Sequence, residues 1–291
     1  MFVRLKKLFL IALVSCITFT SCSNPNELLV DGLKVHFIDV GQGDSILVQT
    51  GSKTMLIDTG LKEKEDEFME YLSSQGIKKI DYLILTHQHN DHIGNAAKVI
   101  KSFKIGMIYM PSVTSNDKKF ESMVKAINQK GLSITAPVSG SSFDFGDAKC
   151  LIMAPNSKKY EDENNYSIVL KMIYKNTSFL FSGDAQFLSE TEMIGKGYDL
   201  SADVLKIGHH GSDTATSEEF LNKVNPKYAA LSCEKNDSKD HPSKKTMKLL
   251  KSKGIQLYRT DESGTIVCTS DGQNISFDKE PGDYKHGKNK E

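Results

Sequence analysis

The sequence predicts one layered domain of the α/β or α+β class. Short apolar runs, typical of buried strands, alternate with segments that have the 3.6-residue apolar spacing of helices. No stretch rich in Pro, Gly or Ser and no internal repeat divides the chain from Leu33 onward. A length of 291 residues allows one large domain or two small ones. A single domain in which helices cover sheets is therefore the simplest interpretation.

The first 22 residues have the pattern of an export signal. A basic start, MFVRLKK, precedes the apolar run LFLIALVSCITFTSC, which is shorter and more polar than a membrane span of about 20 apolar residues. Ser21 directly before Cys22 resembles a bacterial lipoprotein box, and Cys16 fits such a box less well. We therefore expect a lipid at Cys22 that holds the protein at the extracellular face of the bacterial membrane. A cleaved secretory signal and an uncleaved anchor are the alternatives.

Residues 23–32 read as a polar tether, and strand-like runs begin after it. In chain order these runs are LKVHFIDV, DSILVQT, KTMLIDT, DYLILT, KIGMIYM, CLIMAP, YSIVLKMIY, TSFLFSG, ADVLKIG, YAALSC, IQLYRT and GTIVCTS. They are rich in β-branched and aromatic residues, as strands are.

Helix-like segments lie between the strand-like runs, and several of them end at Gly, the usual C-terminal stop. They are KEDEFMEYLSSQG, GNAAKVIKSF, FESMVKAINQKG, SETEMIGKG, SEEFLNKV and SKKTMKLLKSKG. Residues 279–291 are polar and are predicted to form a frayed tail that includes His286. The separated cysteines Cys150, Cys233 and Cys268 are predicted to be small buried hydrophobic residues, not zinc ligands.

The charge balance argues against a protein that attracts nucleic acid from a distance. The chain has 37 basic and 37 acidic side chains, so its formal net charge is zero. Arginine occurs only at Arg4 and Arg259, which leaves few residues for bidentate contacts with bases or phosphates. Sequence-specific reading of DNA is therefore not expected, although a local basic groove is compatible with this composition.

Four potential metal ligands follow one strand-like run in the stretch THQHNDH, residues 86–92. His87 and His89 alternate along an extended loop, so both imidazoles can point to one side and share a cation. Asp91 and His92 follow on the next turn and can reach a second cation. Three of the chain's eight histidines lie in this stretch, which favours a metal site over a polar loop. Imidazole and carboxylate groups suit zinc, manganese or iron.

Three other strand-like runs also end in candidate ligands. TMLID ends in Asp58, FLFSGD ends in Asp184, and VLKIGHH ends in His209 and His210. Ligands in layered α/β folds collect at strand ends, where loops converge. The sequence therefore predicts that these residues and the THQHNDH stretch form one site.

Several ordered motifs resemble those of a known family. The HxHxDH pattern, with an upstream Asp and a downstream Asp and His, resembles the metallo-β-lactamase superfamily. HFIDVGQGDSILVQT, NNYSIVLKMIY, FLFSGDA, DVLKIGHHGS, and HPS followed by GIQLYRTDESGTI resemble the metallo-hydrolase domain of ComEC-type competence proteins. The resemblance implies an αββα sandwich over residues 33–278, with the site at one edge of the sheets. The channel that carries this domain in competence proteins is missing, so we expect a free-standing relative.

The resemblance also implies one or two divalent ions, Zn²⁺ or Mn²⁺, and assigns ligands to them. His87 and His89 would hold the first ion, Asp91 and His92 the second, and Asp184 would bridge both.

The other matched residues receive less definite roles. One of His209 and His210 would complete the second site and the other would act on the substrate or the leaving group; the sequence does not say which. Asp58 matches the buried aspartate that orients the metal loop.

Two features depart from the family pattern. ComEC-type domains often carry Asp where this chain has His89, which is closer to the wider superfamily. No histidine lies between His92 and Asp184, where many members place a third ligand of the first metal. Asn164 and Asn165 occupy that region, and an amide is a weak ligand, so the first ion is expected to bind loosely, and a single-ion site is an alternative.

Five further residues are open to two interpretations. Lys206 either neutralises a substrate phosphate or is a solvated lysine, and His241 either protonates a leaving group or binds phosphate, or only begins a helix. Asp39 and Asp44, in DVGQGDS, either shape the site or form a tight turn. His36 lies in a strand pattern and is expected to be structural.

These observations together predict an exported metal-dependent hydrolase, and most simply a phosphodiesterase that uses a metal-bound hydroxide. The resemblance implies DNA as substrate. The alternatives are another surface phosphodiester, such as a teichoic-acid or phosphorylcholine ester, an amide or lactam, and a catalytically silent tethered binding protein. The chain shows no serine or cysteine nucleophile arrangement and no phosphate-cradling glycine loop. No protein partner is indicated, and the lipid anchor would be the contact with the membrane.

Overall fold

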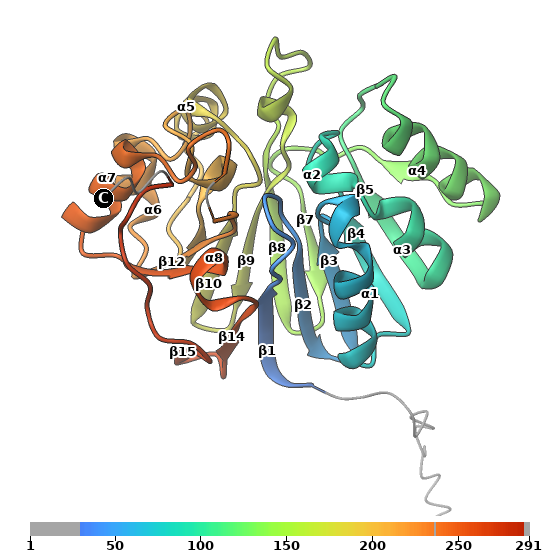
Figure 1. Ribbon diagram of the computed structural model, residues 1–291, viewed down its shortest axis with the longest axis horizontal. Coiled ribbons are helices and arrows are strands. Elements are labelled where there is room, and N and C mark those ends of the chain that lie inside the picture. The colour runs from blue at the N-terminus through green and yellow to red at the C-terminus, as the bar shows by residue number, and fades with distance from the viewer. Residues whose placement is uncertain (1–29, 236, 288–291) are drawn as a thin grey trace, which may run out of the picture.

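Two β-sheets packed face to face, with helices on both outer sides, make up the fold in the computed structural model (Figure 1). The structure describes residues 30–235 and 237–287. The predicted signal and residues 23–29 of the predicted tether lie outside the described residues. The arrangement is the predicted αββα sandwich.

The first sheet has the strand order β15-β14-β1-β2-β3-β4-β5-β6 in the described residues. Its strands are β1 (Val30–Phe37), β2 (Ile46–Gly51), β3 (Lys53–Ile57), β4 (Lys79–Ile84), β5 (Lys104–Tyr109), β6 (Ile134–Thr135), β14 (Ile266–Ser270) and β15 (Ile275–Phe277). β3, β4, β5 and β6 run parallel, and the other pairs are antiparallel.

The second sheet has the order β13-β12-β11-β10-β9-β8-β7 in the same part of the chain. Its strands are β7 (Ser142–Phe145), β8 (Ala148–Ala154), β9 (Val169–Tyr174), β10 (Thr177–Phe181), β11 (Val204–Lys206), β12 (Tyr228–Leu231) and β13 (Gln256–Arg259). β10 to β13 are parallel to one another. Each sheet thus has a parallel half whose strand ends lie at one edge of the sandwich.

The helices belong to two outer layers. The first layer includes α1 (Glu65–Ser74), α2 (Asn90–Ile93), α3 (Ala96–Ser102) and α4 (Lys118–Gln129), and the second includes α5 (Phe187–Gly195), α6 (Glu218–Val224) and α7 (Lys244–Ser252). α8 (Thr260–Ser263) and the short 3₁₀ turns η1 (Lys62–Lys64), η2 (Glu163–Tyr166) and η3 (Gly208–Gly211) lie in connections.

Three apolar clusters hold the layers together. Alternate residues of one strand point to opposite faces, so Val35 and Phe37 of β1 enter the cluster between the sheets. In β2, Val48 enters that cluster, whereas Leu47 packs under the helices of the first layer. A third cluster lies between the second sheet and α5, α6 and α7. Burial on both faces explains why the strands read as continuous apolar runs.

Two predicted boundaries differ from the structure. β1 begins at Val30, which pairs with Gly51 at the end of β2, although residues 30–32 were predicted to belong to the tether. Residues 279–287, predicted to fray, pack against β13: Gly282 N–H donates to Leu257 O, and the Arg259 guanidinium donates to Lys285 O. Backbone hydrogen bonds with a buried arginine order this polar segment.

The predictions for the three cysteines and for His36 agree with the structure, whereas three short strands were not predicted. Cys150, Cys233 and Cys268 are buried free thiols, as predicted. His36 is buried and structural, with its Nδ1 2.7 Å from the Tyr71 hydroxyl. β6, β7 and β15 were not predicted, because their few residues carry little periodicity. In residues 30–235 and 237–287, no helix is both long enough and apolar enough to cross a membrane.

Candidate metal centre

The predicted ligands meet at the edge of the sandwich where the parallel strands of both sheets end. Asp58 follows β3, and the loop 86–92 follows β4 and enters α2. Asp184 follows β10, and His209 and His210 follow β11 in η3. The four strand ends thus bring residues up to 152 positions apart into one place, as the sequence predicted.

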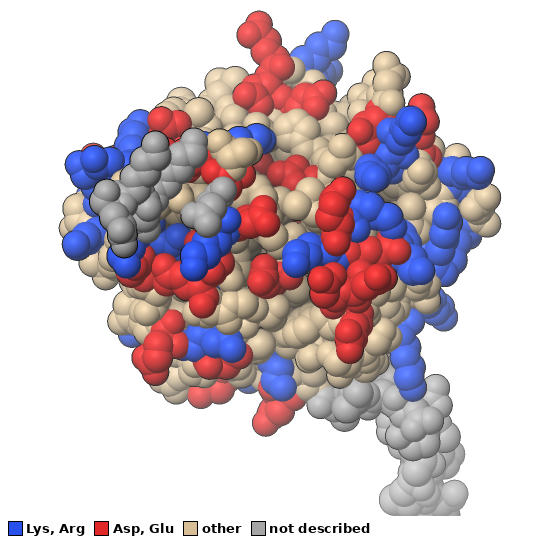
Figure 2. Space-filling model, viewed as in Figure 1, with Lys and Arg blue, Asp and Glu red and all other residues tan. Residues whose placement is uncertain are grey.

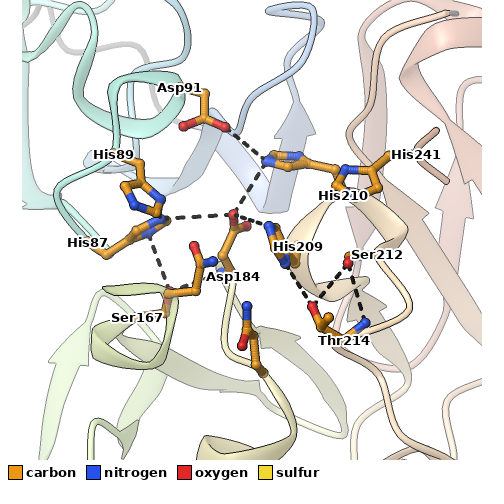
Figure 3. Close-up of polar contacts among 12 residues, drawn as sticks. His87, His89, Asp91, Ser167, Asp184, His209, His210, Ser212, Thr214 and His241 are labelled. Atoms are coloured by element: carbon orange, nitrogen blue, oxygen red, sulfur yellow. Dashed lines mark hydrogen bonds and ion pairs between the residues drawn. The ribbon is translucent and has the colours of Figure 1, made fainter. Parts of the chain in front are cut away.

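Asp184 lies at the centre of this cluster (Figure 3). Its Oδ2 atom is within 4 Å of the Nε2 atoms of four imidazoles: His87 at 3.9 Å, His92 at 3.3 Å, His209 at 3.8 Å and His210 at 3.6 Å. Its backbone N–H donates to the Ser167 hydroxyl over 3.0 Å, which fixes the turn that presents the carboxylate. This position is the one expected of a carboxylate that bridges two ions.

His87 and His89 form one half of the site. Nε2 of His87 lies 2.9 Å from Nδ1 of His89. His87 is fully buried, whereas 37% of the His89 side chain is exposed and its Nε2 lies 3.1 Å from the Glu163 carboxylate. The half therefore contains a buried imidazole 3.9 Å from Asp184 and a solvent-facing imidazole in contact with the first.

Asp91, His92 and His210 form the other half with Asp184. One potential ligand atom from each of these four residues lies within 4.8 Å of the others. His210 Nε2 is 3.5 Å from Asp91 Oδ2. Of the two neighbouring histidines, His210 thus completes the tight cluster. His209 approaches Asp184 from outside it, with Nδ1 3.2 Å from the Thr214 hydroxyl and 15% of its side chain exposed.

The atoms of this half fit a divalent cation. His92 Nε2, His210 Nε2 and Asp184 Oδ1 are buried without a hydrogen-bond partner among the described residues. Buried polar atoms are nearly always paired, and two imidazoles with two carboxylates are a ligand set that zinc or manganese accepts. Two unpaired imidazole nitrogens, which lie 3.3 and 3.6 Å from Asp184 Oδ2, therefore indicate a metal site.

Supporting residues fix the imidazoles of this half. Asp58 Oδ2 lies 2.8 Å from His92 Nδ1, and the same carboxylate accepts hydrogen bonds from the backbone N–H and the hydroxyl of Thr86. His210 Nδ1 is 3.0 Å from the Ser232 carbonyl. A hydrogen bond from Nδ1–H leaves the Nε2 lone pair for a metal. The predicted orienting role of Asp58 agrees with these contacts.

Lys206 takes part in the support and does not face a substrate. Its side chain is fully buried, its ammonium lies 2.8 Å from Asp44 Oδ2, and it donates to the Ile207 carbonyl. Asp44 Oδ1 is in turn 3.6 Å from His210 Nδ1. Because the ammonium is enclosed, neither the phosphate-binding nor the solvated interpretation of Lys206 agrees with the structure.

The carboxylates and imidazoles shift one another's proton affinities. Burial alone would raise the pKa of Asp184, but the neighbouring His92 and His210 hold it well below its ordinary value. Burial lowers the pKa of His92, and the carboxylates of Asp184 and Asp58 overcome that and raise it well above the ordinary value. Burial lowers the pKa of His209, which has only Asp184 as a strong opposing charge. In acid, protons therefore compete with a cation for this site.

Backbone constraints hold the loops in place. Asp58, His209 and His210 adopt positive φ angles of 58°, 47° and 51°, a left-handed conformation that residues other than Gly rarely adopt. A Cβ atom on Gly43 would lie 2.4 Å from the Asp91 carbonyl oxygen, so this position needs glycine. The DVGQGDS segment therefore packs directly on the metal loop. Of the two interpretations of Asp44, this contact agrees with the one in which it shapes the site.

The region in which the family resemblance led us to look for a third histidine is filled differently. Ser167 Oγ lies 3.4 Å from His87 Nδ1, and Glu163 contacts His89. Asn165 Oδ1 accepts hydrogen bonds from the backbone of Gln186 and Ser189, so it supports the Asp184 turn. The first half therefore offers fewer ligands than the second, as the missing histidine predicted.

His241 borders the site without joining the cluster. Its ring centroid is 5.4 Å from that of His209, and its Nδ1 lies 3.3 Å from the Gln42 amide and 3.8 Å from Asp237. It precedes the helix α7, whose N-cap is Ser243. Its position suits a contact with the substrate next to His209, and its catalytic role stays a prediction.

The sequence did not identify several supporting residues. Thr86, Ser167, Thr214 and Ser232 hold ligands by single hydroxyl or carbonyl contacts. A hydroxyl or a backbone carbonyl carries no recognisable spacing. Only the positions of Thr86, Ser167 and Thr214 in THQH, YSIV and HHGSDT signalled that these three belong to the site, and Ser232 lies in none of these stretches.

Sequence comparison gives one family match and several relatives. Residues 38–234 match the family model of the Metallo-beta-lactamase superfamily. The chain is 34% identical over 251 residues to ComE operon protein 3 of Bacillus subtilis (strain 168), which covers 80% of this chain and 32% of that protein. It is 32% identical over 230 residues to competence protein ComA of Neisseria gonorrhoeae, with 78% of this chain and 31% of that protein covered. The chain spans about a third of the length of these relatives.

Solved structures share the fold at low sequence identity. CmlA, a diiron beta-hydroxylase from Streptomyces venezuelae, superposes with a TM-score of 0.54 and 14% identity over 79% of this chain and 53% of that chain. Tm1679, a metal-dependent hydrolase of the beta-lactamase superfamily, gives a TM-score of 0.52 and 14% identity over 78% of this chain and 95% of that chain. These likenesses show the sandwich fold alone.

Proposed function

Because the chain belongs to the metallo-β-lactamase superfamily, we propose that this metal-dependent hydrolase is a phosphodiesterase that cleaves DNA. The observation that carries the proposal is the position of Asp184 Oδ2, within 4 Å of four imidazole nitrogens in one buried site. That arrangement fits a site for one or two divalent ions between the two halves.

The residues that would hold the ions follow from the two halves of the site. Asp91, His92 and His210 with Asp184 would hold one ion, and His87 and His89 with Asp184 would hold the other. When bound, such ions supply Lewis-acid stabilisation of negative charge on phosphate and lower the pKa of water.

The chain's own residues orient the ligands and handle protons. Asp58 and the Ser232 carbonyl fix the His92 and His210 rings with their Nε2 atoms toward the site. His209 is partly exposed and lies outside the tight cluster, so its Nε2 can donate a proton to a leaving alkoxide. Burial lowers the pKa of His209, so near neutral pH only a minority of its imidazoles carry the proton that this role requires.

The names of the relatives support DNA as the substrate. One of them is named a competence protein, and another, 30% identical over 207 residues and from Haemophilus influenzae, is Recombination protein 2. Recombination is a reaction of DNA. Since this chain spans about a third or less of each relative, DNA as its substrate rests on this proposal.

The test is cleavage by the purified protein loaded with Zn²⁺ or Mn²⁺. Single-stranded DNA and bis-p-nitrophenyl phosphate are offered as substrates, beside a teichoic acid, a phosphorylcholine ester and a β-lactam. We expect both the DNA and the small diester to be cleaved, and a chelator or Asp91→Ala to abolish cleavage. Asp66→Ala is the matched control, because Asp66 is an exposed carboxylate in the first turn of α1, away from the site.

The substrate panel separates the alternatives. Cleavage of the teichoic acid or phosphorylcholine ester without cleavage of DNA would assign the site to another surface phosphodiester. Cleavage of the lactam alone would replace the phosphodiesterase proposal altogether. Full metal content without hydrolysis of any substrate would identify a silent binding protein.

We further propose that the protein is exported and lipid-anchored through Cys22. The support is the signal pattern of residues 1–22, with Ser21 directly before Cys22. Cells labelled with radioactive palmitate should yield a labelled protein, and Cys22→Ala should lose the label. Undiminished labelling of the variant would remove the assignment to Cys22, and Cys16→Ala would then test the second candidate.

A further inference from the structure

A basic hollow lies beside the metal centre at the start of α7. Its volume is about 580 Å³, and Lys239, Lys244, Lys245 and Lys248 line it together with His241. Two carboxylates, Asp213 and Asp240, also line it, so its cations outnumber its anions by two when His241 is neutral. The four lysines are exposed in a chain of zero net charge. The hollow is therefore a local positive site without a long-range field.

An exposed aromatic ring lies at the rim of this hollow. Phe187 begins α5, three residues after Asp184, and 37% of it is exposed. The Lys245 ammonium lies over its ring, 5.1 Å from the centroid. Leu188 beside it is 53% exposed. A ring that faces solvent next to lysines has the two contacts, stacking and charge, by which proteins bind single-stranded nucleic acid.

The lysines oppose the stability of the helix that carries them. Lys244 and Lys245 occupy the first turn of α7, which contains no acidic residue. The N-terminus of a helix carries partial positive charge, so cations there are unfavourable and anions favourable. The arrangement weakens the helix and concentrates positive potential in the hollow. A purely structural role for these lysines would not have this cost.

The hollow adjoins the reacting groups. His241 lines it, the His241 ring is 5.4 Å from the His209 ring, and His209 Nε2 is 3.8 Å from Asp184 Oδ2. Phe187 is linked to His209 through Thr214. The Phe187 backbone N–H donates to the Thr214 carbonyl, and the Thr214 hydroxyl contacts His209. A strand that places one phosphodiester at Asp184 can therefore extend its next nucleotide into the hollow.

We propose that Phe187 and the lysines of the hollow form a subsite for single-stranded nucleic acid next to the cleaved bond. A base stacks on Phe187, and the adjoining phosphates contact Lys244, Lys245 and Lys248. The inference rests on the proposed function and specifies its substrate class as a strand with bases, because a base-free polymer would gain nothing from the exposed ring.

The test measures binding in the presence of a chelator, so that cleavage cannot interfere. Fluorescence anisotropy is recorded with a labelled single-stranded oligonucleotide and with an abasic strand of the same length and charge. Phe187→Ala is expected to weaken binding of the oligonucleotide roughly 5- to 100-fold and to leave binding of the abasic strand unchanged. Lys245→Ala is expected to weaken binding of both strands roughly three- to tenfold at low salt.

Two matched variants control for general effects. Lys149→Ala removes an exposed lysine at the start of β8, near the end of the sandwich opposite the site, and should change neither affinity. Met107→Ala removes an exposed apolar side chain of β5 and should leave oligonucleotide binding unchanged. Lys244→Glu should weaken binding of both strands yet raise the melting temperature, because it suits the helix dipole. A structural role for Lys244 predicts a lower melting temperature instead.

The outcomes distinguish this inference from the proposed function. If Phe187→Ala weakens binding of the abasic strand as much as the oligonucleotide, or weakens neither, the stacking subsite is wrong. If the lysine variants bind both strands like the unaltered protein, the hollow is not the substrate subsite, even where the unaltered protein cleaves bis-p-nitrophenyl phosphate. Failure of the metal-loaded, unaltered protein to cleave any phosphodiester overturns the proposed function, whatever the binding results are.

Discussion

His209 and His210 are neighbours in the chain, but their imidazoles have different surroundings. His210 is buried in the four-residue cluster with Asp91, His92 and Asp184, whereas His209 is partly exposed and bonded to Thr214. We expect His210→Ala to lower metal affinity by more than the ~10–100-fold that loss of a supporting residue causes. His209→Ala should keep the metal and lower kcat by roughly 10²–10⁴-fold, as loss of a proton donor does. Isothermal titration with Zn²⁺ and cleavage of bis-p-nitrophenyl phosphate measure the two effects. The reverse pattern would exchange the two roles.

Asp58 supports His92 through one hydrogen bond in a fully buried position. Asp58→Asn keeps the shape of the side chain and removes the charge that fixes the Nδ1 proton of His92. We expect metal affinity to fall about 10–100-fold, measured by competition with a chromophoric chelator. Asp66→Asn, on the exposed face of α1, is the control. An affinity equal to that of the control would show that Asp58 only supports the loop.

The convergence of the candidate ligands was predictable from the sequence, and the division of roles between His209 and His210 was not. His87, His89, Asp91, His92 and Asp184 follow apolar runs, and the ends of parallel strands meet at one edge, so their convergence follows from the pattern. The choice between the two adjacent histidines depends on backbone angles, since both adopt a left-handed conformation that no spacing rule contains. Lys206 was misread for a similar reason, because its partner Asp44 lies 162 positions away in the sequence.

Strand β11 carries a buried ion pair into the core of the site. Lys206, its last residue, lies 2.8 Å from Asp44, and both side chains are almost completely enclosed. Lys206→Met keeps the volume but leaves Asp44 buried without its cation, so we expect unfolding by urea to become easier by about 3–5 kcal/mol. The double variant with Asp44→Asn should recover part of that loss, since no isolated charge remains. A single variant as stable as the unaltered protein would contradict the assignment of Lys206 to support.

Strand β1 and helix α1 are joined by the contact between His36 and Tyr71. Burial, reinforced by the charge of Lys34, lowers the pKa of His36 from 6.5 to about 4. The unfolded chain therefore binds a proton between pH 6.5 and pH 4 that the folded chain does not bind, and stability falls as the pH falls through that window. The contribution of His36 should decline by about 2 kcal/mol between pH 7 and pH 5.

The variant His36→Gln isolates this contribution. Urea unfolding of chelator-treated protein at pH 7, 6 and 5 should show that the stability difference between the unaltered protein and the variant shrinks toward acid. A constant difference over this range would mean that His36 keeps an ordinary pKa in the folded protein. The comparison with the variant removes the titration of all other groups from the result.

At the level of elements, long strands and helices were predictable and short or tied-down segments were not. Strands buried on both faces, such as β3 and β9, produce continuous apolar runs in the sequence. The ends of these runs mark the ends of the strands. β6 has two residues and owes its pairing to β5. The segment 279–287 is polar, so its composition predicts fraying, and only the distant β13 supplies its partners.

On the scale of the whole molecule, the fold leaves the reaction open. The same sandwich occurs in a diiron beta-hydroxylase and in a metal-dependent hydrolase, so the architecture permits more than one chemistry. What distinguishes this chain is carried by residues around the edge of the sandwich: the ligands, the partly exposed His209, and the hollow at α7. Function must therefore be tested at those residues.

The distribution of charge over the surface gives a prediction for the whole molecule. Lysines and arginines are interspersed with acidic residues on the face shown in Figure 2, and the net charge is zero. Binding of a polyanion should therefore depend on salt only through the cations that touch it. For a single strand the slope of log K against log salt is about −0.7 per phosphate neutralised. Four lysines line the hollow at α7, so we expect a slope between zero and about −2.8.

The double variant Lys245→Ala and Lys248→Ala should make that slope about 1.4 less negative, because two phosphate contacts are lost. Lys98→Ala with Lys101→Ala is the matched control, since these exposed lysines line a separate hollow over α3 and α4. Anisotropy titrations of single-stranded DNA from 50 to 300 mM salt, roughly, measure the slope. An unchanged slope in the α7 variant and a reduced one in the α3 variant would place the strand on the other side of the metal centre. Because both variants remove the same charge, a difference between them reports position and not net charge.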